Sequence, residues 1–209
     1  RNPSPGILPG NGLLPDSAFL RNQSPMTKEE IRAVVLSKLR LRPDSIVWDI
    51  GAGTGSVSVA CARFCPFGQV YALEYKAAAL EILEQNKALQ GAENLTVVPG
   101  RAEEQLAALP VPDCVFIGGS GGAMETILQQ LRRIPKRIRL VISAVTLETQ
   151  ALLSACLKGM PGLEIIQLTV HYGKTIGSYH VLDGGHPVLL FCCETEGQET
   201  KCVQEHFMQ

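Results

Sequence analysis

Asp49-Ile50-Gly51-Ala52-Gly53-Thr54-Gly55 is the stretch that decides the fold of this chain. It follows an apolar run at residues 45–48 and precedes a segment with helical spacing. A strand, a glycine turn and a helix in this order place a nucleotide-like ligand at a helix N-terminus. Alternate glycines let the backbone turn sharply and approach a ligand with no Cβ atom between them. The spacing differs from the G-x-G-x-x-G turn of dinucleotide-binding proteins.

The carboxylate of Asp49 indicates the chemistry of the ligand. At the end of a strand it can accept hydrogen bonds from the amides of the turn, or it can face a cation. A ligand with a sulfonium and an amino group suits it better than a pyrophosphate does. The turn resembles the first signature of Rossmann-like S-adenosylmethionine-dependent methyltransferases, although a glycine turn of another α/β protein is the alternative. The cofactor-binding residues implied in this stretch are Asp49, Gly51, Ala52, Gly53, Thr54 and Gly55.

Composition excludes several classes of protein. The chain has 209 residues and is 45% hydrophobic, which is enough for one α/β domain with a full core. A formal net charge of −1 provides no basic field for nucleic acid. No apolar run reaches the ~20 residues of a membrane span, and we expect a cytoplasmic protein. The seven cysteines show no zinc-ligand spacing, so we expect reduced thiols and no metal site.

The ends of the chain differ from its middle. Residues 1–16 are rich in proline and glycine and are expected to form a linker or lead-in. Residues 17–196 are expected to form the methyltransferase domain, and residues 197–209 a flexible tail. The chain starts at Arg1 rather than Met, which suggests an excised fragment.

Between these ends, strand and helix patterns alternate. Strands are expected at residues 45–50, 69–74, 94–98, 113–117, 138–144, 163–172 and 187–194. A first helix is expected from about residue 28 to before Pro43, and a second from the glycine turn to about Phe64. Further helices are expected at residues 77–90, 103–109, 123–134 and 147–158. Thr27 and Glu30 have the spacing of a capping box for the first helix. The alternation predicts an α/β fold, a Rossmann-like doubly wound sheet that is mostly parallel with an antiparallel last strand.

Ligands of such sheets bind at the carboxyl ends of the strands, and this rule selects further candidates. Glu74 ends the second strand, where its carboxylate can accept bonds from both ribose hydroxyls. Arg101 and Ala102 follow the third strand. Methyltransferases of this class often have an acidic residue where Arg101 stands, and an arginine cannot accept the same hydrogen bond. We therefore expect only a backbone contact to the cofactor near Ala102. Gly118 to Gly122 follow the fourth strand, and their glycines favour either close approach of a methyl acceptor or a merely flexible loop.

Basic residues and histidines are less informative. The most basic stretch precedes the fifth strand, so it is expected at the opposite edge, as solvated surface or a partner contact; it contains Arg132, Arg133, Lys136, Arg137 and Arg139. The loop expected at residues 172–179 could hold an anionic substrate through Lys174, or it could be an ordinary loop between the last two strands. His186 and His206 are interpreted as structural or surface residues.

Four further segments narrow the family. They are residues 25–32 (PMTKEEIR), 47–58 (VWDIGAGTGSVS), 115–122 (VFIGGSGG) and 144–149 (AVTLET), with Leu14-Pro15-Asp16 and Phe19 as a lead-in. Together they resemble the decarboxylating precorrin methyltransferases that act at carbon 15 in cobalamin biosynthesis. The resemblance covers about residues 13–194. It implies cofactor contacts at Thr27, Gly51 to Gly55, Glu74 and Ala102.

The resemblance also implies a reaction and partners. A methyl group passes from S-adenosylmethionine to a meso carbon of an anionic tetrapyrrole, and carbon dioxide leaves the ring-C acetate. We name no catalytic residue; substrate contacts are expected at Gly118, Gly119 and Ser120, with Arg101 and Lys174 as cations for its carboxylates. The family assembles as a homotetramer, and in many organisms the domain is the C-terminal half of a bifunctional precorrin-6Y methyltransferase with an upstream methyltransferase domain.

Two other functions remain open from the sequence. A tRNA adenine methyltransferase has similar glycine and acidic positions, but it would need a basic face near the site. A non-catalytic cofactor-binding module would bind S-adenosylmethionine without turnover.

Overall fold

The computed structural model describes residues 13–197. Its helices are η1 (Asp16–Ala18), α1 (Glu29–Leu39), α2 (Ser56–Phe64), α3 (Ala77–Leu89), α4 (Ala102–Gln105), η2 (Leu106–Ala108), α5 (Met124–Arg133) and α6 (Leu147–Cys156). Its strands are β1 (Ile46–Ile50), β2 (Gln69–Glu74), β3 (Leu95–Pro99), β4 (Cys114–Ile117), β5 (Arg139–Ala144), β6 (Glu164–Leu168), β7 (His171–Ile176), β8 (Tyr179–Gly184) and β9 (Val188–Glu194). The expected alternation is confirmed from α1 to α6.

The main sheet has seven strands in the order β3-β2-β1-β4-β5-β9-β6. Strands β1 to β5 pair in parallel, whereas β9 is antiparallel to both β5 and β6. The prediction of a mostly parallel sheet with an antiparallel last strand is therefore confirmed. The order reverses between β1 and β4, and this switch point is where a doubly wound sheet opens a crevice for a ligand.

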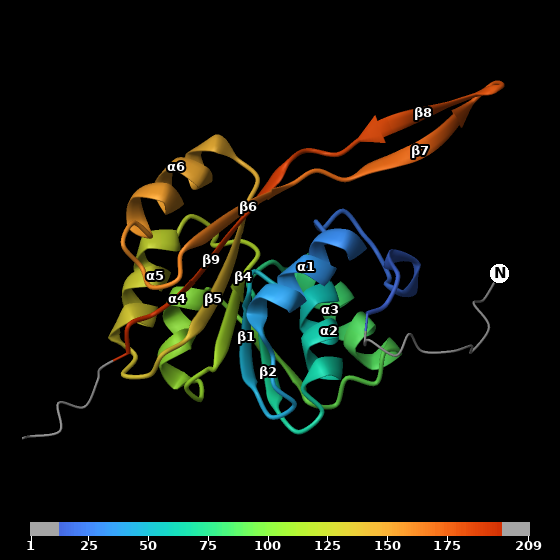
Figure 1. Cartoon of the computed structure of the whole chain (residues 1–209). Helices are drawn as coiled ribbons and strands as arrows, with labels where there is room; N and C mark the ends of the chain where they lie inside the picture. The colour runs from blue at the N-terminus through green and yellow to red at the C-terminus, as the bar shows by residue number, and fades with distance from the viewer. Residues whose placement is uncertain (1–12, 198–209) are drawn as a thin grey trace, which may run out of the picture.

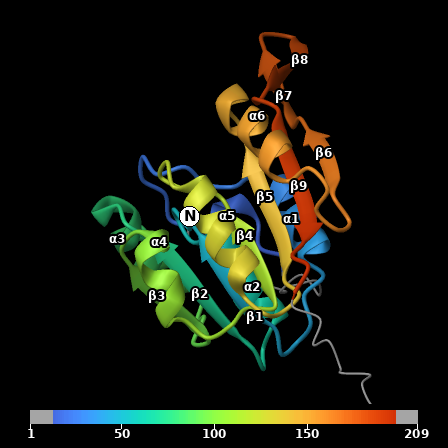
Figure 2. The same cartoon turned by 90° about the vertical axis from the view of Figure 1, so that its left-hand side faces the viewer.

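Helices cover both faces of the sheet. In Figure 1, α1, α2 and α3 lie on one face and α4, α5 and α6 on the other, and Figure 2 shows α5 in front of the strands. Val35, Val59 and Leu83 belong to the core under the first set of helices. Ile127 and Leu153 belong to the core under the second set. Strands between two apolar layers read as continuous apolar runs, which is why β1 and β4 were recognisable.

The prediction of a loop at residues 172–179 is wrong. The chain leaves β6 after Leu168 and forms β7 and β8, an antiparallel hairpin that projects from the domain (Figure 1). Gly177 and Ser178 form its two-residue turn, with Gly177 at φ +61°. A glycine with positive φ at the first turn position suits the twist of a hairpin. Gly-Ser between β-rich flanks was the sequence signal for this element.

The prediction of a capping box at Thr27 and Glu30 is also wrong. Lys28, not Thr27, is the N-cap of α1, and no side chain caps this end of the helix. The carbonyl of Thr27 accepts a hydrogen bond of 2.8 Å from Arg32 Nη1, and Glu30 accepts one of 2.7 Å from the Tyr172 hydroxyl. The Glu30 carboxylate, which the capping box would turn back to the backbone of Thr27, instead accepts a bond from Tyr172, a residue far away in the sequence.

The segment before α1 packs on the domain. Leu14 and Phe19 are buried in the core, so part of the expected lead-in belongs to the packed unit. Asn86 of α3 bonds both the amide and the carbonyl of Leu20. Residues 1–12 of the predicted linker (1–16) and residues 198–209 of the predicted tail (197–209) lie outside the described residues. None of the helices in residues 13–197 is long and apolar enough to cross a membrane.

Candidate functional site

A cavity of about 940 Å³ opens at the carboxyl ends of the parallel strands. Gly51 follows β1, Glu74 ends β2, Gly118 follows β4 and Ser143 lies near the end of β5, and all four line it. Known ligand sites measure roughly 300–1,000 Å³, so this one has room for a cofactor beside a second ligand. The sheet order divides it into a half over β1, β2 and β3 and a half over β4, β5 and β9.

The glycine turn forms the wall between the two halves. Gly51, Ala52 and Gly53 line the cavity, as expected. Gly51 has φ +72°, and a Cβ atom there would lie 2.3 Å from the carbonyl oxygen of Gly119. Gly53 has φ +57°, and its Cβ would lie 2.9 Å from the carbonyl oxygen of Pro25. These glycines are therefore needed because two protein loops pack on the turn, a reason that the ligand alone does not supply.

Three expected cofactor residues lie behind this wall. Asp49, Thr54 and Gly55 do not line the cavity, and Asp49 is 1% exposed. Its Oδ2 accepts a hydrogen bond from the Ser58 hydroxyl, and its Oδ1 has no hydrogen-bond partner among the described residues. Burial raises the pKa of Asp49 to about 7; the Ser58 bond opposes this shift and the charge of Glu74 adds to it. The geometry gives Asp49 a role in holding the turn.

Glu74 lies at the cavity with a buried carboxylate. Its Oε2 accepts the amide of Gly53 at 3.0 Å, and its Oε1 accepts the amides of Tyr75 and Lys76 at 2.8 and 2.9 Å. A carboxylate offers about four acceptor positions, so about one remains for a ligand hydroxyl. Glu74 thus joins the glycine turn to β2 and still presents an acceptor to the cavity.

Arg101 and Ala102 both line the cavity after β3. The guanidinium of Arg101 is 2.7 Å from Glu103 Oε1, donates to the carbonyl of Gly121 at 3.1 Å and lies over the Tyr75 ring. It therefore ties the loop after β3 to the loop after β4. Because Glu103 neutralises its charge, Arg101 is a weaker candidate for a substrate carboxylate than the sequence indicated.

The loop after β4 presents backbone to the cavity through Gly118, Gly119 and Ser120. A Cβ atom at Gly119 would meet no atom within 4 Å, so this position faces open space. Gly119 also packs on Gly51 of the glycine turn. The close approach of a ligand to this loop stays a prediction.

Sequence reasoning missed three basic side chains of the cavity, Lys28, Lys76 and His186, and it chose Lys174, which does not line it. Lys174 lies on β7 with its Nζ 4.0 Å from Asp183 Oδ2. The motif at residues 25–32 contained Lys28, and His186 follows Gly185 at the base of the hairpin. Neither could be placed without knowing where the hairpin leaves the sheet.

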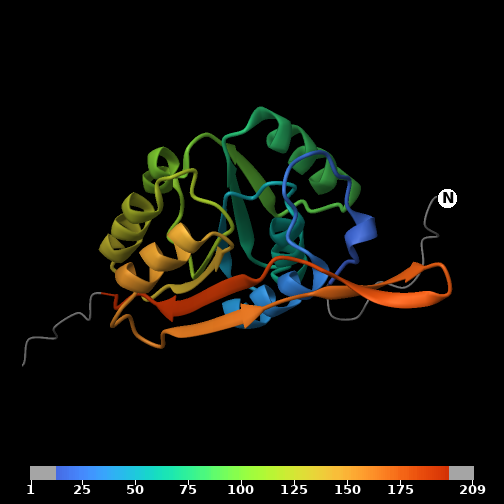
Figure 3. The ribbon, with the colours of Figure 1, turned by 90° about the horizontal axis from the view of Figure 1, so that it is seen from above.

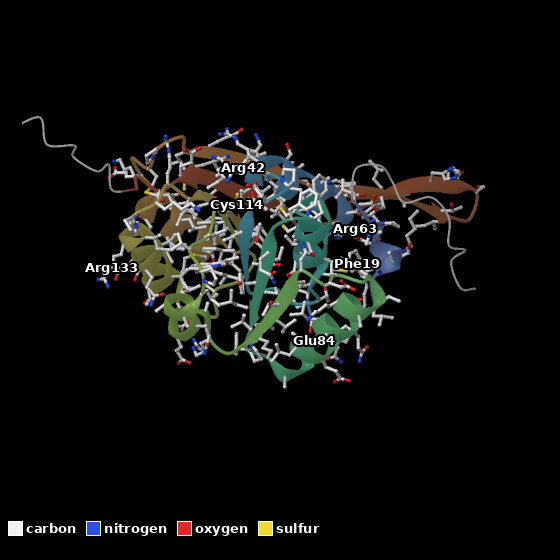
Figure 4. All side chains as sticks on the ribbon, turned by 90° about the horizontal axis from the view of Figure 1, so that it is seen from below. Phe19, Arg42, Arg63, Glu84, Cys114 and Arg133 are labelled. Atoms are coloured by element: carbon white, nitrogen blue, oxygen red, sulfur yellow. The ribbon has the colours of Figure 1, made fainter. Side chains whose placement is uncertain are left out.

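The basic stretch before β5 lies at the opposite edge, as expected. Lys136 pairs with Asp113 at 2.8 Å and Arg137 with Glu194 at 2.6 Å, while Arg139 is buried. Arg133 points outward at the edge of the molecule (Figure 4). Most of these basic side chains bond other groups of the protein, and none of them lines the cavity.

The described cysteines are free thiols, and most are buried. Burial raises the pKa of Cys65 to about 11 and that of Cys114 to about 12. Thiols of this kind stay protonated and unreactive at neutral pH.

Comparison with known proteins agrees with this geometry. The model of the precorrin methyltransferase domain matches residues 18–195. This chain belongs to the precorrin methyltransferase family. The rest of the site can therefore be read as that of a methyltransferase, with S-adenosylmethionine as the methyl donor.

Relatives of this precorrin methyltransferase cover most of its length. The probable cobalt-precorrin-6B C(15)-methyltransferase (decarboxylating) of Pyrobaculum calidifontis is 39% identical over 194 residues, 89% of this chain and 96% of that protein. The precorrin-6Y C(5,15)-methyltransferase (decarboxylating) of a Sinorhizobium species is 37% identical over 141 residues, 66% of this chain and 33% of that protein. The crystal structure of a Geobacter metallireducens precorrin-6y C5,15-methyltransferase has a TM-score of 0.79 and 36% identity, covering 86% of this chain and 96% of its own.

Proposed function

We propose that this methyltransferase transfers a methyl group to carbon 15 of a precorrin and removes carbon dioxide from the ring-C acetate. The observation that carries the proposal is the single cavity that joins the glycine turn to the loops after β4 and β5. It sets a cofactor wall and an acceptor wall side by side across the switch point of the sheet. The names of the relatives from Pyrobaculum and Sinorhizobium supply the carbon position and the decarboxylation.

The half over β1 to β3 fits the cofactor. Thr27, Gly51 to Gly53, Glu74 and Ala102 line it, and we propose them as its contacts. The Glu74 carboxylate suits a ribose hydroxyl, and the short side chains leave the backbone accessible. When bound, S-adenosylmethionine supplies a methyl group on a sulfonium that a nucleophilic carbon can accept directly.

The half over β4, β5 and β9 suits the tetrapyrrole. Its wall combines polar and apolar groups, contributed by Gly118, Gly119, Ser143 and Val145. A meso carbon conjugated to pyrrole nitrogen is already nucleophilic, so the residues mainly need to hold it in line. Positioning of this kind can supply ~7–11 kcal/mol of a barrier.

Mass spectrometry of the tetrapyrrole tests the function. The protein is incubated with S-adenosylmethionine and the precorrin already methylated at carbon 5. We expect a product that is one methyl group heavier and one carbon dioxide lighter. A methyl gain alone would place the decarboxylation elsewhere, and no change with bound cofactor would contradict the proposal.

We also propose that the protein forms a homo-oligomer through the β7–β8 hairpin. Ile176, Tyr179 and Leu182 are 56%, 75% and 74% exposed on this projecting element. Large apolar side chains gathered on one exposed strand pair are typical of an interface. An upstream methyltransferase domain and a cytoplasmic location stay predictions.

A further inference from the structure

The two walls of the cavity differ in how their charges are used. In the half over β1 to β3, Glu74 is bonded by three amides and Arg101 is paired with Glu103. In the other half, Lys28 forms no ion pair with any of residues 13–197, and neither does His186. Lys76 also lines the cavity and likewise forms no ion pair with any of residues 13–197, but it lies two residues after Glu74 and over the Tyr75 ring, in the first half.

Lys28 is held in place without being neutralised. Its Nζ lies 4.6 Å from the centre of the Tyr172 ring. The Tyr172 hydroxyl donates a hydrogen bond of 2.7 Å to Glu30, so this neighbouring carboxylate bonds the tyrosine, and the charge of Lys28 acts on it without an ion pair. A cation over an aromatic face keeps its charge and its N–H donors for another partner. Figure 3 shows the hairpin leaving the sheet beside α1. Tyr172 belongs to β7 of this hairpin and Lys28 is the N-cap of α1, so their contact joins the two elements.

The base of the hairpin brings His186 to the same wall. The Gly185 amide donates a hydrogen bond of 3.0 Å to the carbonyl of Val170, which closes the two ends of the hairpin. A Cβ atom at Gly185 would lie 3.4 Å from Lys28 Nζ, so the ammonium is next to the residue before His186. Val170, Gly185 and His186 all line the cavity. An ammonium and an imidazole from different elements thus converge on one side.

We infer that Lys28 and His186 form a carboxylate-binding subsite that anchors a peripheral acid group of the tetrapyrrole. The inference rests on the proposed function, because a tetrapyrrole with several carboxylates is the anion that this half would receive. Both groups can donate hydrogen bonds to a carboxylate, and bonds that involve an ionised partner are about twice as strong as neutral ones. The subsite replaces Arg101 and Lys174 as the hydrogen-bond donors that fix the acceptor.

The test compares Lys28→Met and His186→Asn with wild type. Methionine keeps an unbranched chain over Tyr172 but removes the charge. Loss of a hydrogen bond to a charged group predicts a KM for the tetrapyrrole that is roughly ten- to a hundredfold higher. The dissociation constant of S-adenosylmethionine, measured by calorimetry, should change less than about twofold. Lys28→Arg should restore most of the affinity.

Lys174→Met is the matched control, since it removes a lysine of β7, the strand that carries Tyr172, and this lysine does not line the cavity. Its KM should equal that of wild type. A normal KM in either Lys28→Met or His186→Asn would overturn the subsite. Weaker cofactor binding in Lys28→Met would also overturn it, because the lysine would then serve the cofactor. If wild type itself gave no turnover, the proposed function would fail instead, so the two failures are distinguishable.

Discussion

Gly119 is the glycine of the cavity wall at which a side chain can be added with the least strain on the fold. Its backbone φ lies outside the left-handed region, and an added Cβ meets nothing within 4 Å. Gly119→Val should therefore change the free energy of unfolding by less than ~0.5 kcal/mol. It should lower kcat/KM at least about tenfold, because the branched side chain occupies ligand space. Chemical denaturation and steady-state kinetics check both expectations.

Gly53→Val is the contrasting variant. Gly53 has φ +57° and is packed against the Pro25 carbonyl, so valine there should cost ~1–2 kcal/mol of stability. A destabilised Gly119→Val or a fully stable Gly53→Val would contradict the packing of these loops.

Asp49 should make the stability depend on pH. Its pKa is about 7 in the fold because of burial, and near 4 in the unfolded chain. Between these values the folded state binds one more proton than the unfolded state, so stability falls as pH rises from about 4 to 7. The Asp49→Asn variant lacks this titration. Urea unfolding at several pH values should show the variant gaining stability relative to wild type over that range; a constant difference would refute the assignment.

At the scale of elements, Arg32 of α1 anchors the segment that carries Thr27 to the cavity. It is fully buried, donates to the carbonyls of Leu14 and Thr27 and pairs with Asp16 at 3.2 Å. Arg32→Met should lower the free energy of unfolding by ~3–5 kcal/mol, because it leaves buried partners unpaired. It should also weaken cofactor binding, which calorimetry would detect.

Arg21→Met is the control for this variant. Arg21 pairs with the same Asp16 at 3.1 Å but is half exposed. Its loss should cost less than about 1 kcal/mol. Equal effects of the two variants would mean that the lead-in is not held through Arg32.

The elements also show how far the sequence reaches. Strands β1 to β5 and their helices were predicted because buried apolar runs and helical spacing are local signals. The capping box failed because Lys28 takes the N-cap position and the Glu30 carboxylate bonds Tyr172, which lies in β7 and far away in the sequence. Glu74 could be assigned to the site because it ends the second predicted strand. The assignment of Lys28 and His186 would have required the position of the base of the hairpin. Position of that kind is tertiary information, which no local pattern contains.

At the scale of the whole molecule, the hairpin should determine the assembly. Replacing Tyr179 and Leu182 with serine removes large exposed apolar side chains without touching the cavity. We expect the oligomer measured by light scattering to dissociate while the folded domain still binds S-adenosylmethionine. The control replaces exposed Leu147 of α6 with serine and should leave the mass unchanged. A wild-type protein that is monomeric at all concentrations would refute the proposed assembly.

The central claim is that one cavity at the switch point of the sheet has a cofactor half and an acceptor half. The most direct measurement is a crystal structure of the protein with S-adenosylhomocysteine. The account predicts density along Gly51 to Gly53 with the ribose at Glu74, leaving Lys28 and His186 free for the tetrapyrrole. Density for the cofactor against Lys28 and His186, or away from the glycine turn, would contradict it.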